Sequence, residues 1–149
     1  GYGNYYSLPA AWIKPLMNKE IETVFPINGK ALWEEDEDKK PYFLKIAIPK
    51  TKKNWAELKL VTEKWVKDEP TNTEAWYELG YANEKLGKVA DALVAYDKAL
   101  EIDQNNSDAL LREGVIYKNK GDANTVAKIQ STLDDVDPNK AWILKNNKY

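Results

Sequence analysis

Residues 73–106 read TEAWYELGYANEKLGKVADALVAYDKALEIDQNN, from Thr73 to Asn106. Two segments of this stretch place apolar and small residues three to four positions apart, and Leu86-Gly87-Lys88 separates them. The aligned positions are Trp76, Leu79, Gly80 and Asn83 in the first segment, and Ala92, Tyr96, Ala99 and Leu100 in the second. This spacing predicts two amphipathic helices joined by a short turn.

Small residues stand where the two predicted helices would cross. Gly80 and Ala92 remove side-chain bulk there, so the two backbones can approach closely. Gly87 stands in the predicted turn, where a left-handed residue is needed. The stretch therefore predicts a tightly packed helical hairpin.

This hairpin resembles the tetratricopeptide repeat, a helix–turn–helix unit that recurs at a fixed period. The residues that match in register are Trp76, Leu79, Gly80, Gly87, Ala92, Tyr96 and Ala99. The main departures are Asn83, where an aromatic residue is usual, and Gln104, where proline is usual. Because one such unit cannot bury its own apolar faces, the resemblance implies a short stack of these units.

The same register extends to both sides. Residues 107–140 read as a divergent second copy, matching at Ala109, Leu110, Gly114, Tyr117, Gly121 and Pro138. A helix from Asn54 to Asp68 reads as the second helix of a degenerate preceding copy, although Pro41 and Pro49 argue against an ordinary first helix near residues 39–52. After the divergent copy, residues 141–144 predict a helix that caps the open end.

The N-terminal third of the chain breaks the helical pattern. Residues 1–18 read as an aromatic arm, which either packs on the helical part or tethers it to a membrane anchor or partner. Asn28-Gly29 between apolar runs predicts a hairpin over residues 22–33. Residues 42–48, YFLKIAI, are rich in strand formers and predict a strand, with irregular helical turns as the alternative.

These patterns predict a mainly α fold. It consists of a short superhelical array of helix pairs with a capping helix, plus a small irregular or β-hairpin segment at the N-terminus. The division is residues 1–50 for the arm and possible hairpin, and residues 51–149 for the repeat domain.

The composition restricts the chemistry. The 149 residues include no histidine and no cysteine, which removes Ser-His-Asp and Cys-His nucleophiles, thiol redox chemistry and zinc sites with these ligands. The acidic run at residues 34–38 lacks the spacing and turn glycine of an EF-hand loop, so a solvated loop is favoured over a calcium site. We therefore expect no enzyme activity, no cofactor, no metal and, at net charge −2, no nucleic-acid partner.

The resemblance implies that the first helix of each repeat lines a concave groove that holds a partner. The groove positions are Glu74, Tyr77, Tyr81 and Glu84 in one repeat, and Asp108, Leu111, Val115 and Lys118 in the next. Two tyrosines rimmed by acids suit an apolar segment with a basic residue. Packing of the tyrosines on the preceding helix or the arm is the alternative. In one group of such repeat proteins, polar residues on these helices clamp a terminal carboxylate. Here Tyr77, Tyr81, Leu111 and Val115 stand at several of those positions, and Arg112 alone fits the pattern, so that clamp is not favoured.

The function that follows is that of a scaffold or assembly factor that binds a protein or peptide. The alternative is a structural subunit of a larger assembly, such as a homo-oligomer or an assembly of the cell envelope, because the arm holds Tyr2, Tyr5, Tyr6 and Trp12. The compartment stays open. Export or a membrane tether is favoured if a signal was removed before Gly1.

Overall fold

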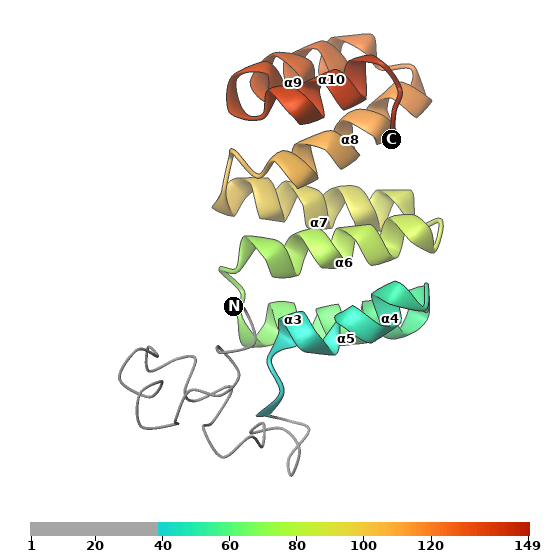
Figure 1. Ribbon diagram of the computed structural model, residues 1–149, viewed down its shortest axis with the longest axis vertical. Helices are drawn as coiled ribbons and strands as arrows, with labels where there is room; N and C mark the ends of the chain where they lie inside the picture. The colour runs from blue at the N-terminus through green and yellow to red at the C-terminus, as the bar shows by residue number, and fades with distance from the viewer. Residues whose placement is uncertain (1–38) are drawn as a thin grey trace, which may run out of the picture. The chain divides into compact units, whose positions relative to one another are not determined.

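The computed structural model describes residues 39–149, and these residues are helical with no strand among them (Figure 1). The helices are α3 (Tyr42–Lys45), α4 (Ala47–Thr51), α5 (Trp55–Asp68), α6 (Thr73–Lys85), α7 (Val89–Ile102), α8 (Ser107–Lys120), α9 (Ala123–Val136) and α10 (Pro138–Lys145). Helix α3 belongs to a unit that ends at Lys45, and the other helices form a compact unit from Ile46 to Tyr149. Within the second unit, each helix from α5 onwards packs on the next one in the chain (Figure 1).

Three left-handed residues mark the repeat length. Lys53, Gly87 and Gly121 are evenly spaced along the chain, one repeat apart, and have φ values of 56°, 78° and 77°. Each one directly precedes the N-cap residue of a helix, namely α5, α7 or α9. The turn of the degenerate preceding copy is therefore built like the other two, although its left-handed residue is a lysine.

Side-chain caps fix most of the helix starts. The side chains of Asn54, Asn72 and Asn106 accept hydrogen bonds from backbone N–H groups in the first turns of α5, α6 and α8. Asp122 does the same for α9. Lys88, at the corresponding position of α7, makes no side-chain cap. The predicted helix with an Asn54 cap is confirmed.

The predicted close approach at Gly80 is confirmed. A Cβ atom at Gly80 would lie 2.6 Å from Cδ1 and Cε1 of Tyr96, which is fully buried on α7. A Cβ atom at the equivalent Gly114 on α8 would lie 2.6 Å from the Cδ2 atom of Leu144. Leu144 lies on α10 and is fully buried, so the predicted capping helix closes the array by filling the position that Tyr96 fills between α6 and α7.

Two apolar clusters form the core around these contacts. One lies between α7 and its neighbours and comprises Ala92, Tyr96, Ala99, Ala109 and Ile116. The other joins α8, α9 and α10 and comprises Leu110, Val115, Ile129, Leu133, Ala141 and Leu144. Because helices far apart in the chain share neither cluster, the core is a series of local interfaces.

The strand predicted at residues 42–48 is wrong. Residues 42–45 form α3, and residues 47 and 48 begin α4, so the alternative of helical turns is the one that occurs. Pro49 is accommodated because it lies in the first turn of α4, where the backbone N–H groups have no intrahelical partner. The first helix of the degenerate copy is thus present, but it is split into two short pieces.

The predictions for the arm, the hairpin and the acidic run concern residues 1–38, which lie outside the described residues. In the part of the chain that the structure describes, no helix combines the length and the apolar character needed to cross a lipid bilayer.

Candidate functional site

The candidate face lies on α6 and α8, the first helices of two consecutive repeats. These helices are linked directly, because the Arg112 guanidinium on α8 donates to both carboxylate oxygens of Glu84 on α6. The N-terminal ends of α6 and α8 are also linked, because the Asn106 side-chain amide donates to the Thr73 hydroxyl at 2.9 Å. Side chains at equivalent positions of the two helices therefore share one surface.

Four aromatic rings form a continuous chain across three helices. The centroids of Tyr77 and Tyr81 are 6.2 Å apart, which places them together on α6. Tyr81 meets Trp55 of α5 edge-to-face at 5.6 Å, and Tyr77 lies 5.9 Å from Tyr96 of α7. Tyr77 and Tyr81 are half-buried, and burial raises the pKa of the Tyr77 hydroxyl well above its usual value. Tyr81 thus packs on the preceding helix and Tyr77 on the following one, and both keep part of their surface open.

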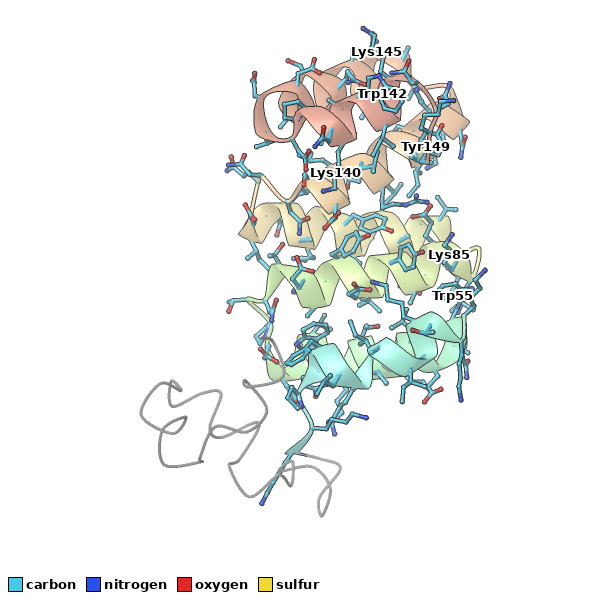
Figure 2. All side chains as sticks on the ribbon, in the orientation of Figure 1. Trp55, Lys85, Lys140, Trp142, Lys145 and Tyr149 are labelled. Carbon is cyan, nitrogen blue, oxygen red and sulfur yellow. The ribbon has the colours of Figure 1, made fainter. Side chains whose placement is uncertain are left out.

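Two lysines lie over the rings at the Trp55 end of this row. The Lys85 ammonium is 5.3 Å from the ring centroid of Tyr81 and 6.0 Å from that of Trp55, and Figure 2 shows it beside Trp55. Lys50 lies 5.4 Å from the Tyr81 centroid and donates to Glu78 Oε1 at 2.7 Å. The chain itself therefore supplies cations to this end of the aromatic row.

Acidic side chains gather at the other end. The pKa of Glu74 is raised, first by burial and then by the neighbouring charges of Asp108 and Glu78. Glu78 pairs with Lys50, and Asp108 pairs with Lys140 at 3.4 Å. Within residues 39–149, no basic side chain lies within ion-pair distance of Glu74. The charge of Lys50 acts in the opposite direction and lowers the pKa of Glu74, so the Glu74 charge is only partly compensated.

Glu84 is engaged inside the protein. It accepts from the Tyr96 hydroxyl at 2.7 Å and pairs with Arg112, and both charged side chains are mostly buried. The hydrogen bond to Glu84 is the main reason that the pKa of Arg112 is raised. Arg112 therefore faces Glu84, and its guanidinium is taken up by that contact.

The α8 positions diverge from the predicted groove. Val115 is 4% exposed within the cluster that joins α8 to α9 and α10, so its predicted exposure is wrong. Leu111 packs partly against the same cluster. The Lys118 ammonium donates to Leu144 O and to Asn147 Oδ1, both at the end of α10. The physical reason is that α10 folds against α8 and occupies the last groove positions.

The structure thus brings Glu74, Tyr77, Tyr81 and Asp108 together. It adds Lys50, which the groove positions left out. The signal was in the sequence, because Lys50 stands one repeat length before Glu84 and so occupies the same repeat position. Among the described residues, no three acidic side chains are placed to hold a metal ion.

Comparison with known families agrees with this architecture. Residues 73–106 match the family described as tetratricopeptide repeat, and residues 95–126 match a second family of the same description. Residues 73–126 are therefore similar to tetratricopeptide repeats, and the unit to which they belong is a short helical repeat array with a capping helix. This confirms the resemblance and supports the assignment of a protein–protein interaction module.

Three curated relatives are similar to parts of the chain. Tetratricopeptide repeat protein 14 of Mus musculus is 48% identical over 27% of this chain and 5% of its own length. The PEX5-related protein of Homo sapiens is 32% identical over 60% of this chain and 13% of its own. The peroxisomal targeting signal receptor of Komagataella phaffii is 33% identical over 44% of this chain and 12% of its own. The similarity spans only a small part of each relative.

Proposed function

We propose that the protein is a non-enzymatic interaction module that holds an apolar peptide segment bearing a basic residue on its α6–α8 face. The observation that carries this proposal is the carboxylate of Glu74, which forms no direct ion pair within residues 39–149 and lies beside Asp108 and the half-buried Tyr77. Burial is the main cause of the raised pKa of Glu74, and a basic side chain placed there would offset the repulsion from Asp108 and Glu78 that adds to it.

The aromatic row supplies the apolar part of the recognition. Tyr77 and Tyr81 are held by Tyr96 and Trp55, so little side-chain entropy is lost when a partner covers them. Rigid aromatic anchors with a charged rim are typical of residues that dominate binding energy. The name of the Komagataella relative, a receptor for a targeting signal, supports a ligand that another protein presents.

A peptide-display selection against the purified chain tests the proposal. We expect the selected sequences to combine Lys or Arg with apolar residues. Glu74→Lys and Asp108→Lys should each weaken their binding about tenfold, because like charges would then meet. Glu101→Lys is the matched control, because Glu101 is exposed on α7, away from the α6–α8 face. Selected peptides without a basic residue, or equal binding to Glu74→Lys and Glu101→Lys, would contradict the proposal.

The tyrosines need a separate measurement. Replacing Tyr77 and Tyr81 with alanine should abolish binding of the selected peptides, but both rings also contact the core. Circular dichroism and thermal unfolding of the double variant must therefore accompany the binding assay. Loss of the folded state would place these residues in the core and leave Glu74→Lys as the decisive variant.

A further inference from the structure

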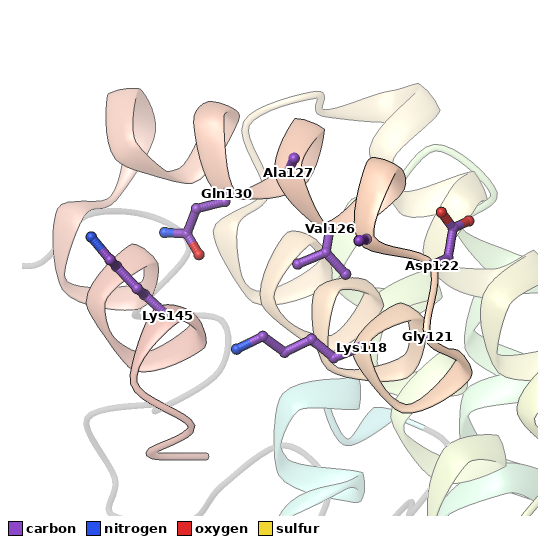
Figure 3. Close-up of a pocket in the computed structure, with 8 residues that line it drawn as sticks. Lys118, Gly121, Asp122, Val126, Ala127, Gln130 and Lys145 are labelled. Atoms are coloured by element: carbon purple, nitrogen blue, oxygen red, sulfur yellow. The ribbon is translucent and has the colours of Figure 1, made fainter.

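A cavity of about 410 Å³ lies where α10 stops covering α9. Helix α9 has 14 residues and α10 has 8, so at 1.5 Å per residue α10 is about 9 Å shorter. The two helices run back along each other from their junction at Asp137, which leaves the N-terminal turns of α9 without a neighbour from α10. The small apolar side chains of Ala123, Val126 and Ala127 line the space that remains. Figure 3 shows Val126 and Ala127 on α9.

Two ammonium groups stand at this cavity without a carboxylate partner. Lys118 donates to Leu144 O and Asn147 Oδ1, which are neutral acceptors, and its ammonium has a third hydrogen to donate. Lys145 also lines the cavity, and no acidic side chain of residues 39–149 pairs with it. Figure 3 shows the Lys118 side chain pointing toward α10 and Lys145 on that same side of the cavity, with Gln130 beside Lys145. The opening is therefore positively charged.

The one acidic residue in the lining does not neutralise this charge. The Asp122 carboxylate accepts hydrogen bonds from the backbone N–H and the hydroxyl of Thr125, at 3.1 and 2.7 Å. Those bonds, together with the charge of Lys128, lower its pKa. Asp122 also lies at the far end of the cavity from Lys145 (Figure 3). Asp122 is thus held by its own helix start, and the lining carries two ammonium groups against one carboxylate, so it keeps a net positive charge.

We propose that this cavity binds a linear aliphatic chain that ends in a carboxylate. The chain lies against Ala123, Val126 and Ala127, and the carboxylate lies between Lys118 and Lys145. Small-molecule sites have this character: volumes of about 300 to 1,000 Å³, mostly apolar walls and a few polar groups that fix orientation. Charge-assisted hydrogen bonds from two lysines select an anion over a neutral or cationic head group. This site lies between the C-terminal end of α8 and helices α9 and α10, and none of its lining residues belongs to the tyrosine row.

Decanoate, kept below its micelle-forming concentration, is the probe. In an amide chemical-shift titration of the full chain, we expect saturable shifts at residues 121–130 and at Lys145. Decyltrimethylammonium has the same chain length and the opposite charge, and it should leave these amides unchanged. The proposal is overturned if decanoate gives no saturable shift, if the two amphiphiles act alike, or if the shifts fall on Tyr77 and Tyr81 instead.

Two variants locate the binding. Ala127→Leu fills the cavity and should weaken decanoate binding about tenfold. Ala90→Leu, at an exposed alanine of α7, is its control and should bind as the unmodified chain does. Lys145→Gln should weaken binding about threefold, as expected for one exposed charge, and leave thermal unfolding unchanged. Lys118 is left intact because it also holds the end of α10. Unaltered binding to Ala127→Leu would refute the assignment of this cavity.

Discussion

The packing of single glycines decides how closely the helices approach. At Gly80 the neighbouring atoms belong to the ring of Tyr96, and a hydrogen bond from its hydroxyl to Glu84 holds that ring in place. At Gly114 the nearest atoms are the terminal methyl groups of Leu144, which can rotate away. The two equivalent glycines therefore differ in how much they tolerate an added methyl group.

We expect Gly80→Ala to lower the free energy of unfolding by about 1 to 3 kcal/mol, because the fixed ring must move. Gly114→Ala should have a clearly smaller effect, since a flexible side chain yields there. Urea unfolding of both variants measures the difference. An equal loss at the two sites would show that Tyr96 is freer to move than its contacts indicate.

Glu113 makes stability depend on pH. Burial, followed by a hydrogen bond and charge repulsion from Asp97, raises its pKa to about 9, whereas the ordinary value is 4.5. Between these values the folded state holds a proton that the unfolded state releases. The contribution of this group to stability is therefore fully present below about pH 4.5 and is lost as the pH rises towards 9.

We expect Glu113→Gln to stabilise the protein at pH 8 and to flatten this dependence, because the amide stays neutral at every pH. Urea unfolding at pH 5 and pH 8 provides the comparison. Glu101→Gln, on the exposed surface of α7, should leave the pH dependence unchanged. A variant that keeps the full pH dependence would place its origin in other groups.

Several residue roles could be predicted from spacing alone, and others could not. Gly80 and Gly87 were predictable, because a close crossing and a left-handed turn each require glycine. The burial of Val115 could not be predicted in this way. A groove position is inferred on the assumption that another repeat of full length follows. Here a short helix folds onto α8 in its place.

The hairpins share one type of turn, which has a left-handed residue followed by the N-cap of the next helix. Two of these turns carry a lysine where another residue type is favoured. Lys53 takes the left-handed conformation that glycine takes in the other turns. Lys88 begins α7 without a side-chain cap. Each departure identifies a substitution that should strengthen one hairpin.

We expect Lys53→Gly to raise the free energy of unfolding by about 1 kcal/mol, because it removes the steric cost of a left-handed side chain. The adjacent Lys52, with φ at −79°, is the control, and Lys52→Gly should destabilise the protein. Thermal unfolding distinguishes the two. A loss of stability in both variants would show that Lys53 makes contacts that outweigh its strain.

We expect Lys88→Asp to raise the free energy of unfolding, because an aspartate there supplies the missing cap of α7. The substitution also removes a positive charge beside Lys59. In the unmodified chain, the contact with Lys59 lowers the pKa of Lys88. Lys88→Ala removes that charge without supplying a cap, so the difference between the two variants in urea unfolding isolates the cap. Equal stability of the two would mean that the charge alone matters.

At the scale of elements, the sequence predicted the helices from Asn54 onwards because their apolar periodicity is long and capped. The prediction was wrong at residues 42–48, where β-branched and aromatic residues between two prolines resemble a strand but form helical turns. The decisive signal was the register, because Lys53 lies one repeat length before Gly87. A left-handed turn at Lys53 implies a helix before it.

Across the whole array, helices contact mainly their neighbours in the chain, so a defect at one end should stay local. Leu144→Ala opens the interface between α10, α8 and α9 and should cost about 2 to 5 kcal/mol there. We expect faster amide hydrogen exchange in α8 to α10 and little change in α5 and α6. Trp142→Ala, at a residue that is 57% exposed, is the control. A uniform rise in exchange would show that the array opens as one unit.

The even spacing of Lys53, Gly87 and Gly121 also has a mechanical consequence. A chain pulled from its two ends would peel away hairpin by hairpin, because each one is held only by the interfaces on its two sides. Every release would lengthen the tether by up to about 120 Å, the extended length of one repeat. The array would then lengthen in discrete steps, and the force at which the first step occurs would be set by its weakest hairpin.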